Sequence, residues 1–167
     1  MSSKHCCIFA AGEYPQRVAP YKGCYLNSFE NDDAFIIACD KGYEQLVSFG
    51  FEPDLVIGDF DSLGYVPEGV KVKKHPCEKD QTDTELAVEY ALSEGCDHFT
   101  IYGALGGRID HSIANINLAA RLAKMGKACV LIGKDEKAMV TVGRRGSVLI
   151  GKKGARFSVF SLDDESD

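Results

Sequence analysis

The sequence predicts an α/β protein: a doubly wound, mainly parallel sheet with helices on both faces, followed by the beginning of an antiparallel region. Two observations carry this prediction. Short apolar runs alternate with helical patterns up to about residue 133, and helices that connect successive strands are typical of parallel crossover units. After that residue come short apolar runs separated by turns of Gly, Lys and Arg, with no helical pattern between them, as in antiparallel hairpins.

Six apolar runs are the expected strands of the sheet, and three segments between them are the expected helices. The strands are residues 6–11, 34–39, 55–57, 70–73, 98–102 and 128–132. The helices are residues 41–49, 83–94 and 110–125, and a glycine follows each of them, as is common at helix C-termini. In the second helix Leu86, Ala87 and Ala91 fall on one face, which predicts that this face packs on the sheet.

The antiparallel region begins near residue 135 and contains the runs AMVTV, GSVLI and ARFSVFSL. We therefore divide the chain into residues 1–134, an α/β domain, and residues 135–167, an all-β element. About thirty residues are too few for a comfortable independent domain. The second element is therefore expected to lean on the first domain or on a partner, or to be incomplete.

Composition excludes several classes of protein. A chain of 167 residues is long enough for one full core, and a net charge of −6 argues against nucleic acid held by bulk charge. No apolar run reaches the roughly 18–20 residues that span a membrane, and the start of the chain resembles a first strand more than a signal peptide. The seven cysteines are odd in number and form no CxxC pair, which favours reduced, mostly buried thiols of a cytoplasmic protein.

Polar and glycine-containing segments follow four of the expected strands. Gly12 follows the first strand, Asp40 and Gly42 follow the second, residues 58–62 the third and residues 103–111 the fifth. In an open α/β sheet, ligands bind beyond the carboxyl ends of the strands. The sequence therefore predicts one site at this edge of the sheet.

The segment GDFDS, residues 58–62, places Asp59 and Asp61 directly after a buried strand. If the chain stays extended the two side chains point the same way, and a pair of carboxylates suits a hard cation such as Mg²⁺. The alternative is a polar turn in which Asp61 and Ser62 cap the next element.

The segment KDQTDTE, residues 79–85, opens the second helix. Thr82 and Glu85 have the spacing of a capping box, and Asp83 falls in the first turn, where a helix favours an anion. Capping alone accounts for these three residues. It does not account for Lys79 and Asp80 just before them, so both a structural and a functional interpretation stay open.

The segment GGRIDH, residues 106–111, opens the third helix. Glycines allow a ligand close to the backbone, and the guanidinium of Arg108 suits phosphate oxygens. The alternative is an ordinary tight turn with a surface arginine, and His111 is interpreted as a capping or hydrogen-bonding residue. Neither a GxxxxGK[ST] loop nor a GxGxxG fingerprint is present, so a phosphate ligand would be held by metal, arginine and glycine backbone.

Taken in order, these four segments resemble the thiamine pyrophosphokinase (thiamine diphosphokinase) family. That family has an aspartate after its second strand, then GDxDS, KDxTD and GGRxDH segments, and the resemblance runs from about residue 6 to residue 162. Lys41 departs from it, since the family often has a glycine there. The resemblance implies that residues 1–134 are the catalytic ATP- and Mg²⁺-binding domain and that residues 135–167 begin a thiamine-binding β-sandwich domain, which in family members continues further.

The resemblance also implies an activity and a set of site residues. The reaction is transfer of diphosphate from ATP to the hydroxyethyl group of thiamine, which gives thiamine diphosphate and AMP in a cytoplasmic homodimer. Asp59, Asp61 and Asp83 would be the catalytic, Mg²⁺-holding carboxylates. Asp40, Lys79, Thr82 and Arg108 would form the ATP site, and Asp110 would lie near thiamine.

Two other interpretations remain at this stage. Haloacid-dehalogenase-like phosphatases also carry a DxD pair after a buried strand, and Asp59 would then be the nucleophile. That interpretation leaves KDQTD and GGRIDH without a role. In such phosphatases the DxD pair normally ends the first core strand, whereas here two strands precede the strand that it follows. A non-catalytic nucleotide-binding or assembly module is the third possibility.

Overall fold

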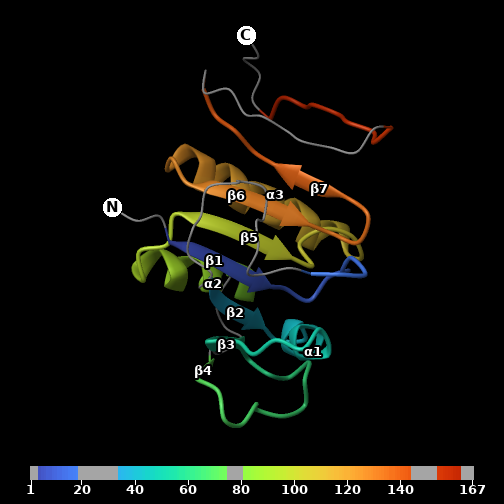
Figure 1. The fold of residues 1–167 in the computed structure, drawn as a ribbon. Coiled ribbons are helices and arrows are strands. Elements are labelled where there is room, and N and C mark those ends of the chain that lie inside the picture. Colours follow the sequence, from blue (N-terminus) through green and yellow to red (C-terminus); the bar gives the residue numbers. More distant parts are fainter. Residues whose placement is uncertain (1–3, 19–33, 75–80, 144–153, 163–167) are drawn as a thin grey trace.

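The computed structural model describes residues 4–18, 34–74, 81–143 and 154–162. These residues form a seven-stranded sheet of order β4-β3-β2-β1-β5-β6-β7 and three helices (Figure 1). The strands are β1 (His5–Phe9), β2 (Phe35–Cys39), β3 (Leu55–Gly58), β4 (Val72–Lys74), β5 (His98–Tyr102), β6 (Ala128–Ile132) and β7 (Lys137–Met139). The helices are α1 (Gly42–Ser48), α2 (Asp83–Ser93) and α3 (Ile109–Lys124).

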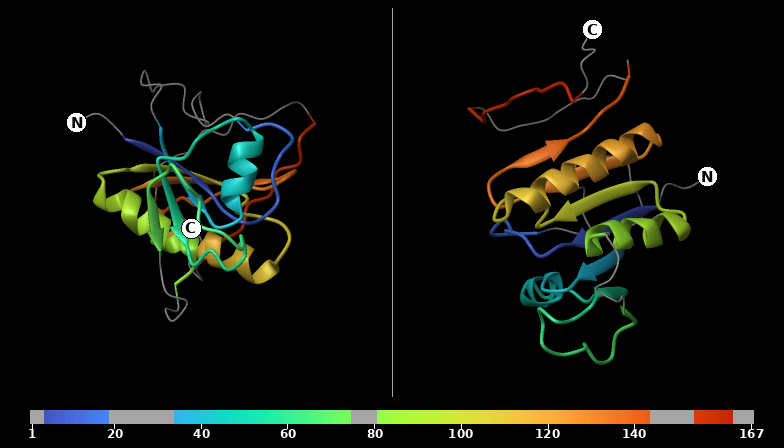
Figure 2. Two further views of the ribbon diagram at one scale, coloured as in Figure 1. Left: turned by 90° about the horizontal axis from the view of Figure 1, so that it is seen from below. Right: turned by 180° about the vertical axis from the view of Figure 1, so that it is seen from behind.

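The predicted doubly wound sheet is confirmed. Every neighbouring pair of strands is parallel except β6 and β7. Cys7 and Phe9 of β1 belong to the apolar cluster that includes Leu46 of α1, whereas Ile8 belongs to the cluster that α2 and α3 cover. Helix α1 therefore lies on one face of the sheet, with α2 and α3 on the other (Figure 2).

The central strands are apolar because both faces of the sheet are covered. Residues Cys6 to Phe9 are fully buried, and so are the last residues of β2 and the whole of β3. A continuous apolar run, rather than alternation, is typical of such a strand. The register aligns Phe9 with Ala38 and with Tyr102, so the segments after β1, β2 and β5 emerge at the same edge.

The prediction that the cysteines are mostly buried is confirmed for the residues that the structure describes. Cys6, Cys7, Cys39, Cys96 and Cys129 are buried, and none of these five forms a disulfide. Cys24 and Cys77 lie outside the described residues. Among the helices of the described ranges, none is long and apolar enough to cross a membrane.

The region after residue 133 differs in part from the prediction. Strand β7 pairs with β6 of the main sheet, because the chain reverses tightly where the Gly133 N–H donates to the Glu136 carbonyl at 3.0 Å. The run GSVLI lies outside the described residues, and residues 155–162 are exposed and contain no strand. A β-sandwich domain that begins at residue 135 therefore remains a prediction.

Candidate active site

Asp40 occupies the turn between β2 and α1, at the carboxyl edge of the sheet. Its backbone has a φ of 44°, and its side chain is almost fully buried, with 9% exposed. Asp40 Oδ1 accepts a hydrogen bond from the Phe60 N–H at 3.2 Å. A buried carboxylate thus connects the turn after β2 with the segment after β3.

The segment after β3 turns sharply at Phe60, whose φ is 65°. Asp59 Oδ1 accepts the N–H of Asp61 at 3.0 Å. The expectation that Asp59 and Asp61 project together from an extended chain is therefore wrong. Two features favour the left-handed conformation of Phe60. Its N–H donates to Asp40, which is distant in sequence, and Phe60 is buried, with 4% exposed.

The start of α2 is a complete capping box. Thr82 Oγ1 accepts the Glu85 N–H at 3.2 Å, and Glu85 Oε2 accepts the Thr82 N–H at 3.1 Å. Glu85 also forms an ion pair of 3.4 Å with Arg121 of α3. The structural interpretation of Thr82 and Glu85 is confirmed, and the cap fixes Asp83 in the first turn of the helix.

Three carboxyl groups from three different segments meet at this edge. Burial, the charge of Asp40, a hydrogen bond with Asp40 and the charge of Asp59 together raise the pKa of Asp83 to about 7. The third carboxyl group beside Asp59 and Asp83 is thus that of Asp40, from the turn after β2. Asp61 is exposed at the rim.

Carboxylates in such an arrangement are candidate ligands for a metal ion. Within the described residues, no group of three or more His, Cys, Asp or Glu side chains is placed to hold a metal ion. Mg²⁺, however, usually takes one or two carboxylates and completes its shell with waters and substrate phosphates. Burial and the neighbouring carboxylates raise the Asp83 pKa. Such a group of oxygen donors fits a cation that arrives with a nucleotide.

The GGRIDH segment forms the loop before α3. Gly106 and Gly107 have φ values of 85° and 64°, which strongly favour glycine. Arg108 is exposed and its Nε donates to Asp110 Oδ1 at 3.1 Å. This hydrogen bond to Arg108 lowers the pKa of Asp110 to about 2. The Asp110 carboxylate also accepts the backbone N–H of His111 at 3.0 Å, so Arg108 and Asp110 form one charged pair at the helix start.

Asn115 was not among the residues predicted from the sequence. It lies in α3 with 6% of its surface exposed, and its Nδ2 donates to the Ala104 carbonyl at 2.8 Å. This contact attaches the loop after β5 to the helix that follows it. The available signal was an asparagine at helical spacing from the buried Leu118 and Leu122, where an apolar residue is expected.

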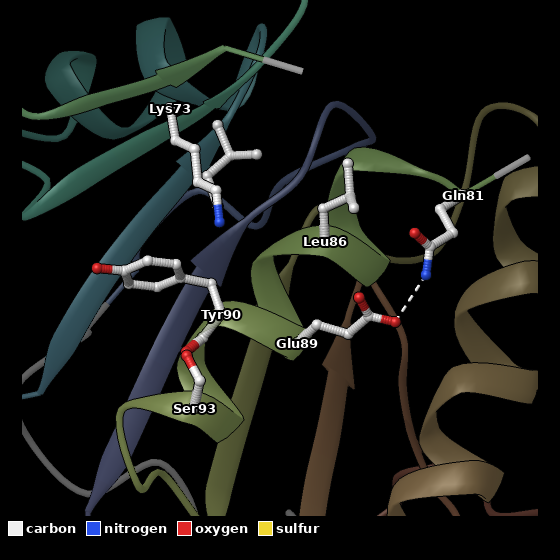
Figure 3. A pocket seen from close by; sticks show the side chains of 7 residues that line it. Lys73, Gln81, Leu86, Glu89, Tyr90 and Ser93 are labelled. Atoms are coloured by element: carbon white, nitrogen blue, oxygen red, sulfur yellow. Dashed lines mark hydrogen bonds between the residues drawn. The ribbon is translucent and has the colours of Figure 1, made fainter. Parts of the chain in front are cut away.

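A pocket of about 210 Å³ lies along α2, beside β4 (Figure 3). Its lining residues are Ile57, Lys73, Gln81, Leu86, Glu89, Tyr90 and Ser93. Gln81 donates to Glu89 at 2.6 Å, and Lys73 Nζ lies 4.9 Å from the centre of the Tyr90 ring. None of the sequence-predicted site residues lines this pocket. Lys79 of the predicted ATP site lies outside the described residues.

Fold and side chains together define a doubly wound α/β protein with an acidic cluster at the carboxyl edge of its sheet, the edge at which such sheets bind ligands. A family model described as thiamin pyrophosphokinase, catalytic domain, matches residues 26–131. The chain belongs to this family. The match confirms the resemblance seen in the sequence and gives no support to the phosphatase or the non-catalytic interpretation.

Individual relatives agree with the family model. Thiamine pyrophosphokinase of Bacillus subtilis is 34% identical over 117 residues, which are 66% of this chain and 54% of the relative. Thiamine pyrophosphokinase 2 of Arabidopsis thaliana is 34% identical over 83 residues, which are 42% of this chain and 31% of the relative. The chain thus spans about half the length of the Bacillus relative and less of the plant one.

Solved structures show the same relation. The thiamine pyrophosphokinase structure from Bacillus subtilis has 31% identity and a TM-score of 0.59, and the match covers 77% of this chain and 60% of that chain. A thiamin pyrophosphokinase family protein from Enterococcus faecalis has 31% identity and a TM-score of 0.59, with 78% and 61% covered.

Proposed function

We propose that the protein transfers a diphosphoryl group from ATP to the hydroxyethyl group of thiamine, which gives thiamine diphosphate and AMP. The observation that carries this proposal is the convergence of Asp40, Asp59 and Asp83 at the carboxyl edge of the sheet, in a chain that matches the thiamin pyrophosphokinase catalytic domain. Transfer of this kind depends mainly on positioning and on stabilisation of charge on the phosphoryl oxygens.

In this proposal Asp59, Asp61 and Asp83 hold Mg²⁺. The ion, when bound, neutralises charge that develops on the phosphoryl oxygens. The carboxylates supply oxygen ligands from two segments, the turn after β3 and the first turn of α2. Without a cation the same carboxylates would repel ATP, so nucleotide binding is expected to depend on Mg²⁺.

The remaining predicted residues surround the phosphates and the acceptor. Arg108, Lys79 and Thr82 contact phosphate oxygens, and Asp40 helps to form the site behind them. To contact phosphate, the Arg108 guanidinium must give up part of its hydrogen bonding with Asp110. Because the side chain is exposed, it can do so. Asp110 then lies close to the cationic thiamine. A site aspartate accepts the proton of the attacking hydroxyl.

The wider organisation follows from the same proposal. The active form is a homodimer in the cytoplasm, and residues 135–167 contribute the beginning of a β-sandwich that completes the thiamine site. The five buried cysteines, none of them in a disulfide, support a reducing compartment. The exposed Phe157, Val159 and Phe160 support a further layer of protein over this segment.

The test is product analysis by ion-exchange chromatography with the intact gene product, Mg²⁺, ATP and thiamine. Thiamine diphosphate and AMP are expected in equal amounts. Asp59→Asn is expected to abolish both products. Asp54→Asn is the matched control. Asp54 lies at the opposite edge of the sheet, where its Oδ2 accepts the Ile36 N–H at 2.7 Å, so this variant should leave turnover unchanged. Formation of ADP or free phosphate instead of AMP would contradict the proposal.

A further inference from the structure

We propose that Asp40 is a positioning residue, which acts through the backbone of Phe60 to aim Asp59, and that Gly58 provides the space for its carboxylate. This inference rests on the proposed function, since it assigns to Asp40 a role in the same site. It specifies how Asp40 contributes to the ATP site, which is by positioning Asp59 rather than by touching the nucleotide.

The backbone of Asp40 is hydrogen-bonded on both sides. Its N–H donates to the Ile57 carbonyl of β3 at 3.1 Å, and its carbonyl accepts the Tyr43 N–H of α1 at 2.9 Å. The Asp40 side chain therefore starts from a point fixed by a strand and a helix. Its φ of 44° is unusual for a residue with a Cβ, and such backbone strain is common at functional sites.

The Asp40 carboxylate holds the turn at Phe60. Oδ1 accepts the Phe60 N–H at 3.2 Å, and Phe60 has the left-handed φ of 65°, which costs free energy in a residue with a Cβ. Asp59 lies directly before Phe60, and its own Oδ1 accepts the Asp61 N–H at 3.0 Å. The direction of the Asp59 carboxylate therefore depends on the turn that Asp40 stabilises.

Gly58 is required for space rather than for conformation. Its φ is not among the positive values of this chain, so other residues could adopt its backbone geometry. A Cβ at this position, however, would lie 2.0 Å from Asp40 Oδ1 and 2.8 Å from its Cγ. Any side chain at residue 58 must displace the Asp40 carboxylate and release the Phe60 N–H.

The positioning role and a direct ligand role predict different results for Asp40→Asn. Asparagine keeps an oxygen that accepts the Phe60 N–H, and its amide can donate to Asp83. It loses the negative charge that a metal or a cationic ligand would require. If Asp40 acts by positioning, Asp40→Asn rescues what Asp40→Ala loses.

The kinetic test compares Asp40→Ala, Asp40→Asn, Gly58→Ala and the double variant Asp40→Ala/Gly58→Ala. We expect Asp40→Ala and Gly58→Ala each to lower kcat by about 100-fold, the size of a misplacement near 1 Å. Asp40→Asn should stay within about threefold of the wild type, and KM for ATP should change by less than kcat. In the Asp40→Ala background, Gly58→Ala should add less than about twofold, because no carboxylate remains to be displaced.

Two variants of Asp54 serve as controls. Asp54 Oδ2 also accepts a backbone N–H from a neighbouring strand, that of Ile36, but at the other edge of the sheet. Asp54→Ala and Asp54→Asn should leave kcat unchanged even where they lower the melting temperature. The inference is overturned if Asp40→Asn loses as much as Asp40→Ala, or if the effects of Asp40→Ala and Gly58→Ala multiply in the double variant.

A second measurement does not require activity. The amide proton of Phe60, followed by NMR in protein labelled with ¹⁵N-phenylalanine, should move upfield in Asp40→Ala and in Gly58→Ala as its hydrogen bond is lost. It should move less in Asp40→Asn. An unchanged Phe60 signal in folded Asp40→Ala would refute the positioning role. Absence of thiamine diphosphate with the wild-type protein would instead refute the proposed function, and the two failures are therefore distinguishable.

Discussion

Replacing Asp83 by asparagine should stabilise the metal-free protein at pH 8. Burial and the charges of Asp40 and Asp59 raise the Asp83 pKa from 3.8 to about 7, and each pKa unit corresponds to about 1.4 kcal/mol. The full shift would amount to about 4 kcal/mol, which screening of this partly exposed group reduces to about 1–2 kcal/mol. In a chain of this size, that corresponds to a rise in melting temperature of about 2–8 °C.

The sign of this effect depends on pH. Below pH 4 Asp83 is protonated in both the folded and the unfolded chain, so its raised pKa contributes nothing to stability. Between pH 4 and about pH 7 the unfolded chain loses the proton while the folded protein keeps it, and the wild type loses stability as the pH rises. Asp83→Asn cannot ionise and escapes this loss.

Thermal unfolding in the presence of EDTA, at intervals from pH 4 to pH 8.5, measures the effect. The gain from Asp83→Asn over the wild type should be near zero at pH 4 and reach its full value above pH 7. Asp110→Asn is the control of opposite sign, since Arg108 lowers the Asp110 pKa to about 2 and the carboxylate stabilises the protein above pH 4. An equal gain from Asp83→Asn at all pH values, or a loss at pH 8, would refute the reasoning.

Three further substitutions test other parts of the site. Asn115→Ala leaves the buried Ala104 carbonyl without its 2.8 Å donor and should cost about 1–3 kcal/mol in urea unfolding, whereas exposed Asn117→Ala should change little. Thr82→Ala removes the cap of α2 and should cost about 1 kcal/mol; Thr82→Ser should restore it. Arg108→Ala should increase KM for ATP and let the Asp110 pKa, followed by carboxyl NMR, return toward its ordinary range; an unchanged Asp110 pKa would contradict the observed pairing.

Most of the sheet could be predicted because its signals are local. The runs at residues 98–102 and 128–132 became β5 and β6 with the predicted limits, since continuous apolar runs between helices leave little choice in a parallel sheet. The capping box at Thr82 and Glu85 was likewise predictable, because both of its hydrogen bonds form within one helical turn.

The geometry of the aspartates could not be predicted, because it depends on contacts between distant segments. The Asp40 carboxylate and the Phe60 N–H are 20 residues apart in sequence, and no local pattern places a phenylalanine at positive φ. Periodicity predicts only an extended chain there. The pairing of β7 with β6 was missed for a different reason, since the absence of an intervening helix is equally consistent with a hairpin on the main sheet and with a new domain.

The two outer strands of the described sheet have a consequence for solubility. Strands β4 and β7 are each three residues long, and lysines occupy positions 73, 74 and 137. A long apolar strand at a border would offer free backbone groups to a second molecule. Short border strands that carry lysines instead discourage two sheets from pairing edge to edge. The strongly apolar strands β1, β2 and β5 lie inside the sheet, where they offer no free edge for aggregation.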